Sequence, residues 1–191
     1  MNNSLYHVHR SGNCDSLWYV GSEMLVDDNF NNFFYANLLE EDKKLIERYG
    51  DYDIDYIISM MEEIKSKDLI EDSLYSDFIK LLNRYYILRR EKALEEGRKL
   101  YIPRAPSRMH SIYLTDDSCL HYWKNVVGNG SCKIFLLELD GNLFVSSDKL
   151  FPDNSLLFDN QVELSKDYWK PKVKSLTPKE YVFQGKINIV K

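Results

Sequence analysis

The fold is decided by three short segments that lie far apart in the chain: Leu5-Tyr6-His7-Val8-His9-Arg10, Ser111-Ile112-Tyr113-Leu114-Thr115 and Glu180-Tyr181-Val182-Phe183. All three are short segments with the character of β-strands. Each segment also carries one side chain suited to chemistry at a position where a buried or cleft-facing residue is expected. Because segments so distant in sequence meet only through tertiary folding, the pattern predicts a sheet assembled from both ends of the chain.

A helical period replaces the strand pattern between about residues 38 and 100. A first helix begins near Leu38 and ends at Gly50, and Asp53 caps a second that carries isoleucines and methionines. The third begins at Asp72 or Ser73 and is expected to end at Gly97. Its apolar stripe is most simply core packing, and its charged side a solvated face.

The strand pattern returns after Pro103 and Pro106, which break the third helix. Thr115 or Asp116 caps a short helix that runs to about Val126. Further strands are expected at 132–139, 143–145, 181–183 and 187–190. Asp140-Gly141-Asn142 predicts a hairpin turn between the first two, and Gln184-Gly185 a turn or bulge between the last two. The fold class is therefore α+β, a single domain over residues 1–191 with a block of about three helices inserted at 38–100.

Composition limits the classes of function. The chain has 191 residues, 44% hydrophobic and 14% aromatic, with a net charge of -5 and a pI near 5.4. Such a chain buries a sizeable core, and its acidity argues against non-specific nucleic-acid binding, which needs a basic face. Cys14, Cys119 and Cys132 lack the spacing of a zinc site or redox pair. With no signal peptide or membrane-spanning run visible, we expect a cytoplasmic protein without membrane contact.

His7 and His9 are two residues apart, so they share one face of a strand. In that position they suit a ribose hydroxyl or phosphate, or a metal, or they are simply half-exposed histidines on an edge strand. A metal-dependent hydrolase is the weakest of these alternatives, because no further histidine and carboxylate set stands at ligand spacing. We therefore predict no metal site.

Tyr113 lies where a strand ends and a helix begins, and its ring there can stack on a planar heterocycle. Tyr122 and Trp123 on the following helix are candidates for a second wall of such a site, although all three also fit a core of aromatics. Glu180 stands at a strand entrance, where a carboxylate is often merely solvated. In a cleft, it can hold a ribose hydroxyl and stabilise an oxocarbenium-like transition state.

Taken together, the three segments resemble the ADP-ribosyltransferase superfamily, in the branch whose signature is His, Tyr and Glu on separate strands. Leu5 to His9 is similar to the opening "Y-H-x-T" strand, Ser111 to Asp117 to the "G-x-Y-[FL]-[ST]" strand, and Lys179 to Gly185 to the glutamate strand. The resemblance implies a split antiparallel β-sheet core and cleavage of the nicotinamide–ribose bond of NAD, or a related nucleotide, as substrate. ADP-ribose then passes to an unknown acceptor.

The resemblance also assigns roles to individual residues. Glu180 would be catalytic, Tyr113 would stack on nicotinamide, and His7 would contact the adenosine-side ribose. The further cofactor-binding candidates are His9, Arg10, Thr115 and Tyr122, and Arg108 is a candidate phosphate contact on charge grounds. We expect His7, Tyr113 and Glu180 to line one cleft, with side chains within about 10 to 12 Å of one another.

The sequence departs from the signature at three positions. His9 stands where a small hydroxyl residue is usual, Ser111 replaces the glycine, and Pro178 takes the place of the glutamate or glutamine of arginine-specific members. An arginine-modifying reaction is therefore not expected. The chain as a whole is also similar to a bacterial domain family of unknown function. A competing hypothesis is a domain of the same type that has lost catalysis and binds a nucleotide, a nucleic-acid end or a protein partner.

Overall fold

The computed structural model describes residues 4–10, 15–30, 32, 36, 72–128, 131–154, 156–171 and 177–191. The chain falls into two compact units, one made of Met1–Phe33 with Arg90–Lys191 and the other of Phe34–Arg89. The two helices predicted between residues 38 and 64 lie outside the described residues. The organisation as a single domain stays a prediction.

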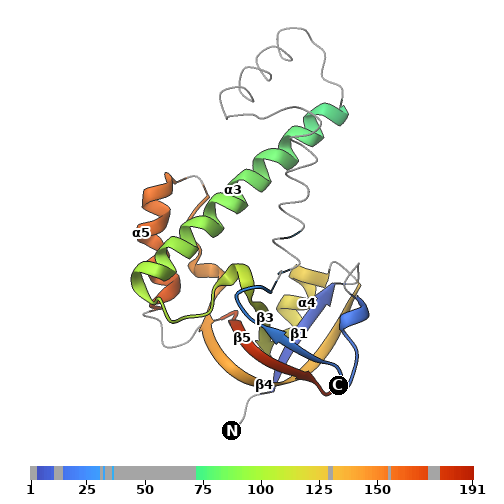
Figure 1. Cartoon of the computed structure of the whole chain (residues 1–191). Coiled ribbons are helices and arrows are strands. Elements are labelled where there is room, and N and C mark those ends of the chain that lie inside the picture. The colour runs from blue at the N-terminus through green and yellow to red at the C-terminus, as the bar shows by residue number, and fades with distance from the viewer. Residues whose placement is uncertain are drawn as a thin grey trace, which may run out of the picture. The chain divides into compact units, whose positions relative to one another are not determined.

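The first unit is built on a five-stranded antiparallel sheet (Figure 1). Its strands are β1 (Leu5–Arg10), β2 (Glu23–Val26), β3 (Ile112–Asp116), β4 (Cys132–Ser146) and β5 (Glu180–Ile189). β1 pairs with β3 and β4, and β5 pairs with β4, β3 and β2. The three segments identified in the sequence are thus neighbouring strands, and the predicted α+β class with an antiparallel sheet is confirmed.

β4 and β5 are longer than the sequence suggested. The hairpin expected at Asp140-Gly141-Asn142 is absent, because β4 runs unbroken through these residues, and β5 likewise continues through Gln184-Gly185. Gly141 pairs with Gly185, and a Cβ on Gly141 would lie 2.6 Å from the Gly185 Cα. The two glycines permit a close approach of two long strands. In sequence, glycines with this role resemble turn signals.

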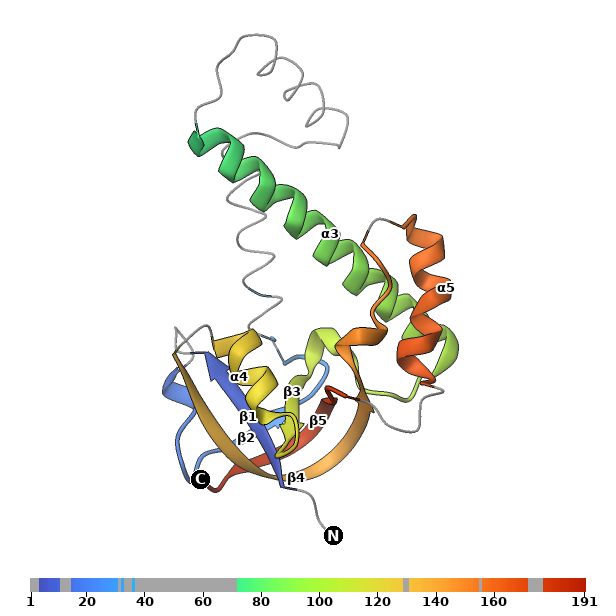
Figure 2. The ribbon, with the colours of Figure 1, turned by 180° about the vertical axis from the view of Figure 1, so that it is seen from behind.

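α3 (Asp72–Tyr101) begins where the cap residues predicted it, but it passes through Gly97 and ends just before Pro103. The glycine is a packing residue, because a Cβ there would lie 1.7 Å from the Ser165 Oγ of α5 (Phe158–Trp169). α5, which the sequence analysis did not predict, lies beside the C-terminal part of α3 in both views (Figures 1 and 2). The Trp169 indole donates to the Leu94 carbonyl at 2.7 Å and fixes this pairing.

A short helix after the tyrosine segment was expected, and α4 (Leu120–Gly128) follows β3 and packs on β1. The predicted cap residues are wrong, because Thr115 and Asp116 belong to β3 and a turn separates them from the helix. Gly21 adopts a positive φ of 89°, in keeping with the turn predicted there, and β2 follows it. Two cores organise the unit. One fills the inner face of the sheet and includes Trp18 and Phe135, and the other joins Leu94 of α3 to Tyr168 and Trp169 of α5.

Candidate functional site

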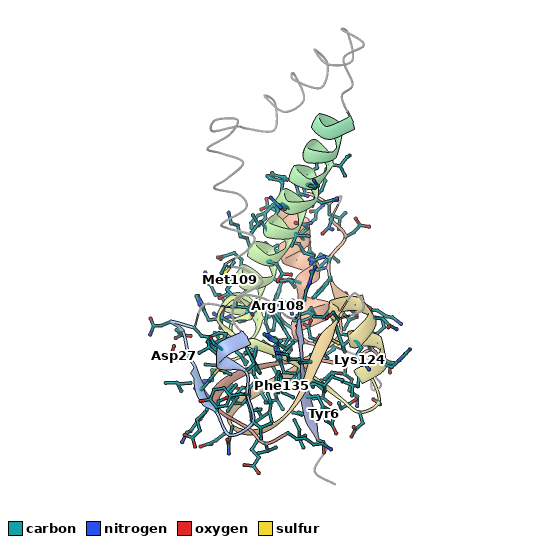
Figure 3. All side chains as sticks on the ribbon, turned by 90° about the vertical axis from the view of Figure 1, so that its right-hand side faces the viewer. Tyr6, Asp27, Arg108, Met109, Lys124 and Phe135 are labelled. Atoms are coloured by element: carbon teal, nitrogen blue, oxygen red, sulfur yellow. The ribbon has the colours of Figure 1, made fainter. Side chains whose placement is uncertain are left out.

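His7 packs on the inner face of the sheet. Its ring stacks on Trp18 with centroids 4.0 Å apart and planes inclined by 17°. His9 lies beside both rings, 5.8 Å from His7 and 5.3 Å from Trp18. Across the sheet, His7 pairs with Phe135 of β4, whose side chain belongs to the same core. Phe135 is labelled in Figure 3.

The His7 imidazole is neutral at physiological pH. Burial lowers its pKa, the hydrogen bond to the Tyr113 carbonyl opposes that change, and His9 lowers it further, to about 4. The Nδ1 atom lies 3.0 Å from this carbonyl oxygen. Because a carbonyl only accepts, Nδ1 carries the proton and Nε2 is the acceptor nitrogen of the ring.

This hydrogen bond marks the point where β1 and β3 part. The two strands pair at Leu5–Asp116 and Tyr6–Thr115. Beyond these pairs, side chains bind two carbonyls of the β3 segment. His7 donates to that of Tyr113, and the amide of Asn32 donates to that of Ser111 at 2.5 Å. Side-chain donors therefore satisfy these two carbonyls where the backbone pairing of β1 with β3 stops.

Tyr113 and Glu180 meet on the other face of the sheet, at a shared cation. Ile112 and Leu114 both point into the inner core, so Tyr113 between them points outward. The Arg108 guanidinium lies 4.9 Å from the Tyr113 ring centroid and forms an ion pair with Glu180. The Tyr113 hydroxyl donates a hydrogen bond to the Arg108 carbonyl at 2.8 Å. Figure 3 shows Arg108 near the foot of α3.

Arg108 is the centre of a buried ionic cluster, and its side chain is only 5% exposed. Its Nε donates to Glu91 of α3 at 2.9 Å, and its Nη1 donates to Glu180 and to the Tyr168 hydroxyl. Arg90 approaches Glu91 at 3.2 Å, so two guanidinium groups face two carboxylates. Although burial alone lowers the pKa of Arg108, the charges of Glu180 and Glu91 outweigh it and hold that pKa well above its ordinary value.

Tyr168 completes the surroundings of Glu180. Its hydroxyl donates to Glu180 Oε1 at 2.5 Å, the same oxygen that Arg108 binds. Burial raises the pKa of Tyr168 well above its usual value, so the phenol stays protonated and remains a donor. Glu180 is 5% exposed. Its carboxylate is therefore held in place from α5, while Arg108 also binds it from the segment after α3.

The structure brings together two of the three side chains that the sequence singled out. Tyr113 and Glu180 share Arg108, whereas His7 lies on the opposite face and reaches them only through the Tyr113 backbone. The expectation that all three side chains line one cleft is corrected in this respect. The reason is strand alternation, because His7 shares the face of Leu5 and Phe135 rather than that of Tyr113.

The other candidates are scattered around this centre. His9 is 7% exposed and packs on Trp18 and Phe135, and Thr115 is 2% exposed in β3. Arg10 is exposed at the end of β1. Tyr122 is 37% exposed, and its hydroxyl donates to Asp148 at 2.5 Å. That hydrogen bond first, then burial and the charges of Asp148 and Glu180, raise the pKa of Tyr122 to about 12.

Sequence reasoning missed Glu91, Tyr168 and Trp18, and it assigned Arg108 to phosphate rather than to Glu180. The burial of Arg108 gives no periodic signal in the sequence, because an arginine that follows two prolines in a loop is usually exposed. Tyr168 and Trp169 stood in a segment without an assigned element. Their adjacency at the end of α5 was the one available signal, since two large aromatics together favour burial.

The part of the chain that the structure describes contains no group of three or more His, Cys, Asp or Glu residues placed to hold a metal ion. None of its helices is long and apolar enough to cross a membrane.

Comparison with protein families matches residues 5–191 to DUF2441, a protein family of unknown function. The chain belongs to this family. No curated protein matches the sequence. Because the DUF2441 match covers the sheet, α4, α5 and the segment between β2 and β3, the whole arrangement around Arg108 lies within the family's boundaries. The family supplies no activity, so the function is argued from the site.

Proposed function

We propose that this DUF2441 protein is an ADP-ribosyltransferase-like enzyme that cleaves the nicotinamide–ribose bond of NAD or a related nucleotide. The observation that carries the proposal is the meeting of Tyr113 and Glu180 at Arg108, on adjacent strands of a single sheet face. A stacking ring and a carboxylate are the two groups that this reaction needs most. The acceptor of ADP-ribose is not identified by these residues, and we place the enzyme in the cytoplasm.

The chemistry assigns one task to each group. The Tyr113 ring stacks on the nicotinamide and orients it as a leaving group. The Glu180 carboxylate binds a ribose hydroxyl and stabilises the positive charge that develops at the anomeric carbon. Arg108 and Tyr168 both bind Oε1 of Glu180, so the proposal assigns the ribose hydroxyl to Oε2. His7 positions Tyr113 through its carbonyl and does not contact the nucleotide.

A second candidate function is a domain of the same type that binds a nucleotide or a protein partner without catalysis. The burial of Glu180 favours it, since the carboxylate is 5% exposed and bonded to both Arg108 and Tyr168. A glutamate held in that way also serves to neutralise a buried arginine. In the catalytic reading, binding of the nucleotide must make Glu180 accessible.

Nicotinamide release by purified protein tests the first proposal, with calorimetric titration of NAD as the second measurement. Replacing Glu180 with Gln keeps the shape and removes the charge, so release should fall about 100-fold or more while NAD affinity changes much less. Tyr113→Ala should mainly weaken binding through lost stacking. Glu163→Gln, on the exposed side of α5, is the matched control and should behave as the wild type.

The outcomes separate the two candidates. Release by the wild type that persists in Glu180→Gln refutes the role of Glu180. NAD binding without release, under any acceptor tried, leaves the non-catalytic domain as the better account. If the wild type neither binds NAD nor releases nicotinamide, the proposal that NAD is the ligand is overturned.

A further inference from the structure

The two residues beside Glu180 are both bound by one carboxylate on the opposite side of β5. Side chains alternate along a strand, so Lys179 and Tyr181 point away from the Arg108 side. Asp116 Oδ2 accepts from the Lys179 Nζ at 2.6 Å and from the Tyr181 hydroxyl at 3.0 Å. Asp116 therefore anchors the chain immediately before and immediately after Glu180.

The backbone of Lys179 is held as well, by Cys119 just before α4 and by Trp123 within it. Its amide N lies 3.3 Å from the Cys119 Sγ, and its carbonyl accepts from the Trp123 indole at 2.7 Å. Counting its side chain, Lys179 is therefore bound at three points. This fixes the direction in which the chain enters β5 one residue before Glu180.

Asp116 is itself fixed. It is the last residue of β3 and pairs with Leu5 of β1, and its Oδ1 accepts from the Ser118 amide at 3.0 Å and the Ser118 hydroxyl at 2.5 Å. Burial alone raises the pKa of Asp116, but hydrogen bonds from Lys179, Ser118 and Tyr181 outweigh that effect and bring it to about 2. The residue is 5% exposed and ionised at physiological pH.

We propose that Asp116 is a positioning residue that sets the orientation of Glu180 relative to Tyr113. The assignment rests on the proposed function of Glu180 and adds a residue that it did not include. Asp116 lies three residues after Tyr113 on β3, and it binds both neighbours of Glu180 on β5. One strand thus carries the stacking ring and the anchor that holds the carboxylate beside it. Small displacements of a reacting group lower the rate of reaction, because catalytic groups must lie within about 0.5 Å of their productive positions.

The first test needs no enzymatic activity. The carboxyl carbon of Glu180 is observed by NMR in protein labelled at glutamate side chains, and its resonance is assigned by its loss in Glu180→Gln. Asp116→Asn removes the charge that anchors Lys179 and should shift this resonance. Glu23→Gln is the matched control, because Glu23 forms an exposed ion pair at 3.2 Å with Lys186, a lysine of the same strand β5. It should leave the resonance unchanged.

The second test reads nicotinamide release and NAD affinity in the same variants. Asp116→Asn should lower kcat about 10-fold, with the NAD dissociation constant changed less than about 2-fold. Lys179→Met and Tyr181→Phe each remove one hydrogen bond to Asp116 and should produce part of the decrease in kcat. Neither should add to Asp116→Asn in a double-mutant cycle. These two variants also keep the test decisive if Asp116→Asn fails to fold.

An unchanged Glu180 resonance in Asp116→Asn, or in both Lys179→Met and Tyr181→Phe, overturns the assignment of Asp116. A shifted resonance in a protein that releases no nicotinamide supports the positioning contact while the proposed reaction fails. A shifted resonance with an unchanged kcat shows that Asp116 does not position a catalytic group.

Discussion

Replacing Arg108 with Met is expected to destabilise the protein severely, because it removes the cation that two buried carboxylates share and leaves Glu91 with Arg90 alone. Glu91 is 1% exposed and Glu180 is 5% exposed, and both bind the guanidinium. Removing one partner of a buried ion pair costs about 3 to 5 kcal/mol, because the remaining charge stays desolvated. Arg108 also lies 4.8 Å from the Phe151 ring centroid and 5.0 Å from that of Tyr168, contacts that Met replaces only in part. A loss near the upper end of that range is a large fraction of a typical domain stability.

The assay is urea unfolding at pH 7, followed by tryptophan fluorescence. Adding Glu180→Gln to Arg108→Met should recover much of the loss, since the charge at position 180 is then removed while Glu91 keeps its ion pair with Arg90. Arg104→Met, at an exposed position in the same loop, is the control and should change stability by less than about 0.5 kcal/mol. A loss below about 1 kcal/mol for Arg108→Met would refute the buried cluster.

Two further predictions concern packing and pH. Gly97→Ala places a Cβ 1.7 Å from the Ser165 Oγ. Overpacking costs of about 1 to 3 kcal/mol should exceed the roughly 1 kcal/mol gain in helix propensity, so the melting temperature should fall. Lys92→Ala, at an exposed position of α3, is the control and should not lower the melting temperature. An unchanged melting temperature in Gly97→Ala would contradict the packing of α3 on α5. The pKa of His7 is lowered from 6.5 to about 4, so the unfolded chain binds a proton more readily than the folded one. The stability that neutral His7 supplies is complete above pH 6.5 and is lost as pH falls towards 4, by up to about 3 kcal/mol. Urea midpoints of wild type and His7→Gln across this range measure it, and parallel pH profiles for the two proteins would show that His7 titrates normally.

Most of the strands were predictable because each carries a local signal, whereas β2 was not predicted. The segments around His7, Tyr113 and Glu180 are short and strand-like, and their pairing is consistent with that prediction. The glycines were misleading. Gly97 and Gly141 read as stop and turn signals, but both allow a close approach of other elements, which only the tertiary structure reveals.

The site was predictable only in part, since sequence identifies the type of residue and not the face it occupies. Tyr113 and Glu180 were expected to meet, and they do so through Arg108. His7 was expected beside them, but its place relative to β3 depends on a register that no local pattern encodes. Glu91 is a similar case, because a glutamate on an amphipathic helix resembles an exposed one until its partner is known.

The two candidate functions make different demands on Glu180, and its stability contribution distinguishes them further. A carboxylate kept only to neutralise Arg108 should be more costly to replace than one kept for catalysis, since every one of its contacts then serves the fold. Catalytic groups are commonly held at some cost to stability, and replacing them often stabilises a protein. Glu180→Gln retains an acceptor for Tyr168 but leaves Arg108 with less opposing charge. A pronounced loss of stability in this variant, together with no nicotinamide release by the wild type, would place Glu180 in the fold rather than in the reaction.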